Sequence, residues 1–237
     1  FANLSLLCHQ QGDLTQASAH GHRALAIHRA VGSRANVGIS LGNLGDTLYA
    51  LGEVEAAEEG DLPLLLQAAD VRGILHVHTR ASDGADTLEK MVEAVRQRGY
   101  EYVCICDHSK SAGYVFGLKV SDIEQQHAEI DTLQSALPDV RILKGIESDI
   151  LGDGNLDYDD DILARFDLVV VAIHNAMAMD EAALTKRVIR ALEHPAANVF
   201  AHPTGRLLLE REGYRINLEE VIAAAAANNV ALELNTH

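Results

Sequence analysis

The sequence predicts an α/β chain in which an all-helical segment precedes a parallel sheet or (β/α) barrel covered by helices. The first observation is a helical pattern with an internal repeat across residues 1–58. The second is the change of period after residue 72, where short apolar runs alternate with amphipathic segments. The third is that these runs are almost continuously apolar, which is typical of strands buried on both faces of a parallel sheet. A chain of 237 residues, 48% of them hydrophobic, has room for a small and a medium-sized domain.

The helical segment repeats at an offset of 40 residues. The stretches NLSLLCHQQGDLTQA (3–17) and NLGDTLYALGEVEAA (43–57) share Asn, Leu, Gly and Ala at corresponding positions. A repeat of this length predicts stacked helical hairpins and resembles tetratricopeptide repeats of the longer kind, which implies a protein partner. The alternative is an ordinary helical hairpin. Residues 59–72 are interpreted as a linker to a second domain over 73–237.

Six strands and four helices are expected in this second domain. Their alternation favours parallel pairing, because each helix carries the chain back to the same end of the sheet. The expected strands are 73–79, 101–108, 141–150, 167–175, 198–203 and 231–235, and the expected helices lie near 86–98, 121–136, 180–193 and 217–228.

Histidines gather at the carboxyl ends of the predicted strands. The stretch LHVHTRASDG ends the first strand with His76 and His78, although about 0.6 such His-x-His pairs are expected by chance in this histidine-rich chain. A period of two places both rings on the same side of the strand. His108, His174 and His202 end later strands. Because the carboxyl ends of barrel strands build the site of a (β/α) barrel, these rings are expected to form one cluster.

Glu147 lies in the third predicted strand, within the otherwise apolar stretch LKGIESDIL. A carboxylate buried there is costly unless it is protonated, hydrogen-bonded or coordinated to a cation. If the strand-end histidines bind two cations, the Glu147 carboxylate is suited to bridge them with its two oxygens. Imidazole and carboxylate ligands together suit zinc, manganese or iron. We therefore expect two or three divalent ions, with Mn²⁺ or Zn²⁺ as the first candidates and Fe²⁺ as a third.

Residues 71–236 resemble a PHP domain, named after polymerase and histidinol phosphatase, and in particular the C-terminal PHP domain of bacterial family X DNA polymerases. The motifs that carry the resemblance are DVRGILHVHTRASDG, YEYVCICDHSKSAG, RILKGIESDIL, FDLVVVAIHNA and FAHPTGRLL. The resemblance implies a distorted seven-stranded barrel with a multinuclear metal site. It assigns His76 and His78 to the first metal pair, Glu147 as the bridge, His174 and His202 to the second position, and Asp83 and His108 to a third ion.

This resemblance implies hydrolysis of a phosphate ester by a metal-activated water. Lys110 and Arg206 follow ligand motifs closely and are candidates to hold phosphate oxygens; the alternative is that each is a surface cation. The family likeness favours processing of DNA 3′ ends, as an exonuclease or 3′-phosphatase. A small-molecule phosphatase of the histidinol-phosphatase kind is a second hypothesis. A repeat-based adaptor with a non-catalytic barrel is a third.

Charge and cysteine content restrict these hypotheses. The formal net charge is −16, which is unusual for a nucleic-acid-binding module and requires metal ions or local cations to offset repulsion from phosphate. Three cysteines make no disulfide framework, and Cys104 and Cys106 are expected to be buried thiols on one strand face. No run of about 18 apolar residues occurs, so no membrane span and a cytoplasmic location are expected.

The sequence departs from the family pattern at both ends. Helical repeats stand where the polymerase domains are expected, and the chain starts with Phe, which indicates a piece of a longer protein. The family's seventh strand with its Asp-x-His pair is absent after LELNTH. This piece is therefore expected to have an open sheet edge, to bind its ions weakly, to lose the third ion first and to hydrolyse substrates poorly.

Overall fold

The computed structural model of the chain describes residues 12–30, 68–113, 115–207 and 211–233. The chain divides into two compact units, Phe1–Gln67 and Ala68–His237. No helix in the described ranges is long and apolar enough to cross a membrane.

The first unit contributes one described helix, α2 (Leu14–Ala30). Asp13 caps its start by accepting a hydrogen bond from the backbone N–H of Gln16 at 3.0 Å. Ala17 and Ala24 are buried, and their spacing of seven residues places both on one face of the helix. This helix agrees with the helical prediction for its own residues. The rest of the predicted repeat segment, and residues 59–67 of the predicted linker, lie outside the described residues.

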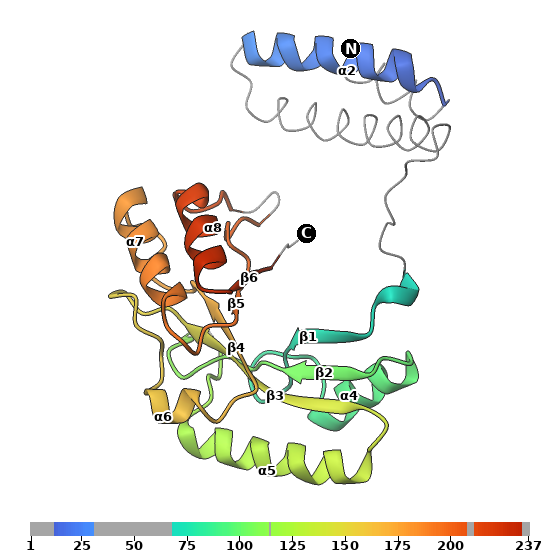
Figure 1. Ribbon diagram of the computed structural model, residues 1–237, viewed down its shortest axis with the longest axis vertical. Helices are drawn as coiled ribbons and strands as arrows, with labels where there is room; N and C mark the ends of the chain where they lie inside the picture. The colour runs from blue at the N-terminus through green and yellow to red at the C-terminus, as the bar shows by residue number, and fades with distance from the viewer. Residues whose placement is uncertain (1–11, 31–67, 114, 208–210, 234–237) are drawn as a thin grey trace. The chain divides into compact units, whose positions relative to one another are not determined.

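The second unit is built on one six-stranded sheet whose strands follow the chain order β1 to β6. Every neighbouring pair is parallel, which confirms the predicted parallel sheet. Figure 1 shows the sheet curling from β1 at one edge to β6 at the other, as in an open barrel. The strands are β1 (Gly73–Val77), β2 (Tyr102–Ile105), β3 (Arg141–Asp149), β4 (Leu168–Ala172), β5 (Val199–Phe200) and β6 (Ala231–Leu232).

Helices connect the strands and cover the sheet, as Figure 1 shows. α4 packs against β1 and β2, α5 packs against β3, and α7 and α8 pack against each other, with α8 also against β6. Thr87, Asp180 and Asn217 each cap the helix that follows by accepting a backbone hydrogen bond. The helices are η1 (Ala68–Asp70), α4 (Leu88–Gln97), α5 (Val120–Ala136), the short α6 (Asp160–Leu163), α7 (Glu181–Leu192) and α8 (Leu218–Ala227).

The inside of the sheet is filled by apolar strand residues and two thiols. Cys104 and Cys106 are free and fully buried, as predicted, and their Sγ atoms lie 3.5 Å apart. They pack over Gly145 of β3, where an added Cβ would come within 2.5 Å of both sulfur atoms. A side chain larger than hydrogen has no room at this position. Gly145 thus allows β3, the strand that carries Glu147, to pack closely against the two thiols of β2.

Candidate metal centre

The two histidines of the opening motif meet at the end of β1, but a simple alternating strand does not bring them there. The pairing of β1 with β2 shifts register between Ile74 and Val77. His76 lies in this irregularity with a left-handed backbone, at φ 59°, and His78 follows the strand. Their ring centroids are 5.1 Å apart. A non-glycine residue with positive φ is strained, and such strain is typical of functional sites.

Glu147 is the centre of the cluster. Its side chain is 1% exposed and its carboxylate lies within 3.5 Å of five imidazoles. The two oxygens face different rings, which is the arrangement that a bridging carboxylate requires. Oε1 lies 3.1 Å from His202 Nε2 and 3.3 Å from Nε2 of both His76 and His174, whereas Oε2 lies 2.9 Å from His108 Nδ1 and 3.5 Å from His78 Nε2.

His76 comes from β1 and His202 follows β5, four strands away in the sheet order, and their ring centroids are nevertheless 6.5 Å apart. The curl of the sheet therefore brings the ends of β1 and β5 to the same carboxylate. Like His76, His202 has a left-handed backbone, at φ 31°. Two strained backbones thus contribute to one cluster.

Asp83 extends the cluster toward solvent. Its Oδ1 lies 3.1 Å from His78 Nδ1 and its Oδ2 lies 3.3 Å from His108 Nε2. The side chain is 42% exposed, so this end of the cluster is open. Three groups within the described residues have ligand atoms within 4.8 Å of one another and could each hold an ion: His76, His78 and Glu147; His78, Asp83 and His108; and His108, Glu147 and His174.

Two further carboxylates orient the histidines from behind. Asp149 Oδ1 lies 2.6 Å from His174 Nδ1, and Glu233 Oε1 lies 3.0 Å from His76 Nδ1. Glu233 Oε2 also accepts a hydrogen bond from the backbone N–H of His202 at 2.8 Å. In metal sites such a carboxylate fixes the ring orientation and raises the basicity of the ligating nitrogen. Neither Asp149 nor Glu233 is among the site residues that the sequence predicts.

These contacts test whether the residues fit a cation. If Nδ1–H of His76 donates to Glu233, a neutral ring aims the lone pair of Nε2 at the Glu147 carboxylate, which is repulsive unless a positive charge lies between them. His76 Nε2 and Glu147 Oε2 are buried and make no well-directed hydrogen bond among the described residues. A donor set of neutral imidazoles around one carboxylate is typical of sites for zinc or manganese. The residues therefore fit divalent ions.

Burial and the close contacts between carboxylates and imidazoles also shift the pKa values of the clustered histidines and of Glu147. Burial lowers the pKa of His76 and of His174, but their carboxylate partners outweigh it and raise each pKa to about 9. Burial raises the pKa of Glu147, but the surrounding histidines, His108 first, outweigh it and hold its pKa well below the ordinary value. Burial and the neighbouring His108 and His76 lower the pKa of His78 despite Glu147. The centre of the cluster thus favours a positive charge.

A model of the PHP domain matches residues 75–237. The chain belongs to the PHP-domain family. A tetratricopeptide repeat model matches residues 1–59.

Two curated relatives and one solved structure resemble this PHP-domain chain. "DNA polymerase/3′-5′ exonuclease PolX" of Bacillus subtilis (strain 168) is 43% identical over 73% of this chain and 30% of its own length. A "Probable phosphatase" of Acetivibrio thermocellus is 30% identical over 68% of this chain and 64% of its own length. The chain thus spans less than two thirds of either relative. A histidinol phosphate phosphatase (HISK) of Lactococcus lactis, solved with zinc, L-histidinol and phosphate, aligns with a TM-score of 0.46 at 18% identity over 70% of this chain and 73% of its own.

Asp107 of the PHP domain, next to His108, organises a loop. Its fully buried carboxylate accepts hydrogen bonds from the backbone N–H and hydroxyl of Thr79, both at 2.7 Å, and from the Ser82 hydroxyl at 2.5 Å. Gln126 of α5 donates to it as well, at 2.7 Å. These contacts show that Asp107 fixes the loop which presents Asp83.

Arg187 of α7 supports His174 from the other side. This buried guanidinium donates to the Leu151 carbonyl at 2.8 Å and to the Asn175 side-chain oxygen at 2.8 Å. Asn175 in turn donates to Asp149 Oδ2 at 3.2 Å. The contacts run from Arg187 through Asn175 and Asp149 to His174. This chain of contacts could not be predicted, because its residues come from three different segments.

The two predicted phosphate-binding cations lie in different surroundings. Arg206 is exposed and lines a cavity of about 340 Å³ together with His174 and His202. Lys110 is exposed and its Nζ lies 5.0 Å from the centroid of the Tyr158 ring, while its backbone N–H donates to the Tyr158 hydroxyl at 3.2 Å. The PHP domain therefore brings Arg206 beside the cluster. Lys110, on the loop after His108, has the Tyr158 ring as its aromatic partner.

Proposed function

We propose that the PHP domain of this chain is a metal-dependent phosphoester hydrolase. The observation that carries the proposal is the buried Glu147 carboxylate, which divides five imidazoles between its two oxygens. Membership of the PHP-domain family supports it. The proposed ligands of two or three divalent ions, Mn²⁺ or Zn²⁺ first and Fe²⁺ third, are His76, His78, Asp83, His108, Glu147, His174 and His202.

Bound divalent ions would supply a hydroxide from water near neutral pH and would neutralise phosphoryl oxygens. The chain's own residues prepare the site for this chemistry. Glu233 and Asp149 hold His76 and His174 by their Nδ1 atoms, so that each Nε2 faces the cluster. The exposed side of Asp83 leaves one end of the cluster open to a substrate.

We further propose that Arg206 binds a phosphate oxygen of the substrate. Its place in the cavity beside His174 and His202 supports this role, because a guanidinium can hold two oxygens of one phosphate. Lys110 is proposed as a second phosphate contact, since the loop that carries it starts at His108. Its ammonium group lies over an aromatic ring, and no carboxylate neutralises it among the described residues.

For the substrate we propose a DNA 3′ end, processed as by an exonuclease or 3′-phosphatase. The 43% identity to a relative named as a polymerase and 3′-5′ exonuclease supports this choice. A small-molecule phosphatase is the second candidate, favoured by relatives named as probable phosphatases and by the net charge of −16, which repels a polyanion. We also propose that residues 1–58 bind a protein partner, which the tetratricopeptide match supports. A pure adaptor role is its alternative.

The test is a hydrolysis assay with the purified chain and Mn²⁺ or Zn²⁺. The substrates are bis-p-nitrophenyl phosphate, single-stranded DNA with a 3′-hydroxyl or a 3′-phosphate, and histidinol phosphate. Glu147→Gln is expected to abolish turnover of whichever substrate is used, and Glu219→Gln, which changes an exposed glutamate of α8, is expected to retain it. Metal-dependent turnover that survives Glu147→Gln, or none of any substrate in the wild-type chain, would contradict the proposal.

A further inference from the structure

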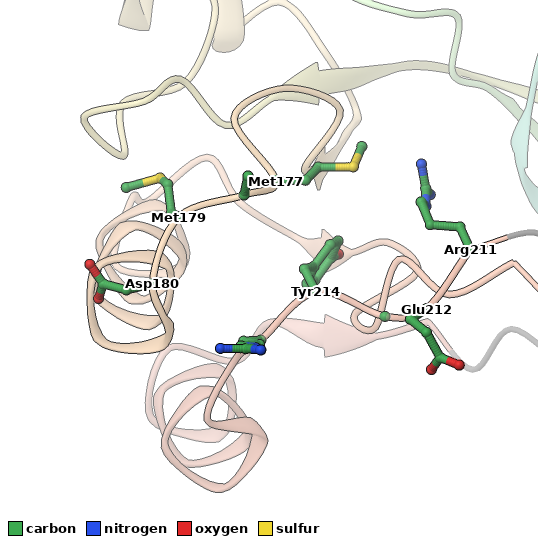
Figure 2. Close-up of a pocket in the computed structure, with 9 residues that line it drawn as sticks. Met177, Met179, Asp180, Arg211, Glu212 and Tyr214 are labelled. Carbon is green, nitrogen blue, oxygen red and sulfur yellow. The ribbon is translucent and has the colours of Figure 1, made fainter. Parts of the chain in front are cut away.

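A second cavity of about 510 Å³ lies beside the one that contains Arg206. Met177 and Arg211 belong to the walls of both cavities, so the second adjoins the metal cluster through the first. Its own walls include Met179, Tyr214 and Arg215. Figure 2 shows Tyr214 between the methionine side and Arg211, with Arg211 and Glu212 pointing in opposite directions.

Within the described residues, the arginines around these cavities have no ion-pair partner. Arg206, Arg211 and Arg215 make no ion pair with any described residue, whereas Arg72, Arg96 and Arg165 of this acidic chain each pair with a carboxylate. Arg211 donates from Nε and Nη2 to the Gly205 carbonyl, at 3.0 and 2.8 Å. A neutral acceptor fixes the guanidinium without cancelling its charge.

Asp180 and Glu212 also line the second cavity, but neither forms an ion pair with these arginines within the described residues. The Asp180 carboxylate caps α7 by accepting a hydrogen bond from the Ala183 backbone N–H at 2.9 Å. Glu212 is exposed and points away from Arg211 in Figure 2. Arg211 and Arg215 thus have no carboxylate in direct contact among the described residues, and their guanidinium groups can pair with an anionic ligand.

The remaining wall is apolar and partly fixed. Tyr214 donates its hydroxyl to the backbone carbonyl of His202 at 3.0 Å, and burial raises the pKa of this hydroxyl well above its ordinary value, so the side chain stays neutral. Met177 and Met179 supply flexible thioether surfaces that adapt to varied shapes. The cavity thus offers a neutral aromatic and thioether wall beside two guanidinium groups. A complementary ligand has a ring-bearing body and an anionic group.

We propose that this second cavity is a binding subsite for the non-reacting part of a phosphoester that carries a second phosphate. The proposal rests on the proposed hydrolase function, which places the reacting phosphate at the metal cluster beside Arg206. The ring-bearing body then lies against Met177, Met179 and Tyr214, and the second phosphate contacts Arg211 and Arg215. Simple monophosphates fill only the first cavity, so the subsite selects ring-bearing bisphosphates over them.

The test is calorimetric binding of two probes to the Mn²⁺-loaded chain, thymidine 5′-monophosphate and thymidine 3′,5′-bisphosphate, with probe integrity checked by chromatography. Because a charge-assisted hydrogen bond is involved, the bisphosphate is expected to bind roughly tenfold more tightly. In Arg215→Gln, which alters an exposed side chain, the preference is expected to fall clearly below that of the wild-type chain, because only Arg211 is left to contact the second phosphate. The matched control is Arg98→Gln at the end of α4, which removes the same charge outside the cavity and is expected to keep the preference.

Hydrolysis of bis-p-nitrophenyl phosphate is measured in parallel, so that the two proposals fail separately. Equal affinity of the wild-type chain for both probes, or a preference that Arg215→Gln retains in full, would overturn the subsite even in an active enzyme. A preference that falls in Arg215→Gln but not in Arg98→Gln supports the subsite, even if the chain hydrolyses nothing and the proposed function is wrong.

Discussion

Glu233 is the residue through which the last strand of the sheet acts on the proposed metal site. It follows β6, its side chain is 30% exposed, and its two oxygens bind His76 Nδ1 at 3.0 Å and the His202 backbone N–H at 2.8 Å. Glu233→Gln keeps the size of the side chain and removes its charge. The amide still has one oxygen to accept a hydrogen bond, so the fold is expected to persist while His76 becomes a weaker and less well-oriented ligand.

The expected magnitude follows from what such carboxylates contribute elsewhere. Loss of a carboxylate behind a metal-bound histidine weakens metal binding by about 10–100-fold, or about 1.4–2.7 kcal/mol. At saturating metal the folded chain loses the same amount of stabilisation by linkage. For a unit of this size, residues 68–237, that corresponds to a fall in melting temperature of about 3–11 °C in the presence of metal.

Two measurements check this prediction. Competition with a chromophoric chelator gives the Zn²⁺ affinity, and thermal melting with and without metal gives the linkage. Glu219→Gln serves as the control, because it removes one negative charge from an exposed position on α8. If Glu233→Gln binds Zn²⁺ as tightly as the control, then Glu233 does not tune His76 and our account of the rear carboxylates is wrong.

Three further predictions concern packing and metal linkage. Gly145→Ala places a Cβ 2.5 Å from the sulfur atoms of both Cys104 and Cys106 and is expected to cost about 1–3 kcal/mol in urea unfolding; unchanged stability would show that β2 and β3 can separate there. Arg187→Ala leaves the Leu151 carbonyl and the Asn175 side chain without their donor, so we expect a loss of roughly 2–4 kcal/mol together with weaker metal binding. An effect on stability alone would argue against its link to His174. A strong chelator is expected to lower the melting temperature of the wild-type chain, and an unchanged melting curve would mean that no ion is bound.

The sheet could be predicted from the sequence because its strands are short, apolar and separated by amphipathic helices. The expected helix 121–136 and the observed α5 (Val120–Ala136) differ by one residue at one end. The grouping of the strand-end histidines also followed from topology alone, because parallel strands end at one edge of the sheet. What the sequence could not show is the local path of β1. The left-handed backbone at His76 interrupts the simple alternation on which the prediction relied.

The residues behind the cluster could not be predicted, for a physical reason. Asp149 and Glu233 act through contacts with residues 25 and 157 positions away. Nothing in their own neighbourhood distinguishes them from other acidic residues of an acidic chain. Asp157 illustrates the same limit: it belongs to the acidic stretch 153–161, yet it is buried and accepts a hydrogen bond from the Ser111 backbone at 2.6 Å.

The central claim is that divalent ions bind around Glu147, and anomalous X-ray scattering from crystals grown with Mn²⁺ tests it most directly. The account predicts at least two anomalous peaks at the Glu147 carboxylate, one beside His76 and His78 and one beside His108 and His174. It also predicts that these peaks weaken or vanish in Glu147→Gln. Crystals of the wild-type chain with no peak at this carboxylate, or with peaks that are unchanged in Glu147→Gln, would contradict it.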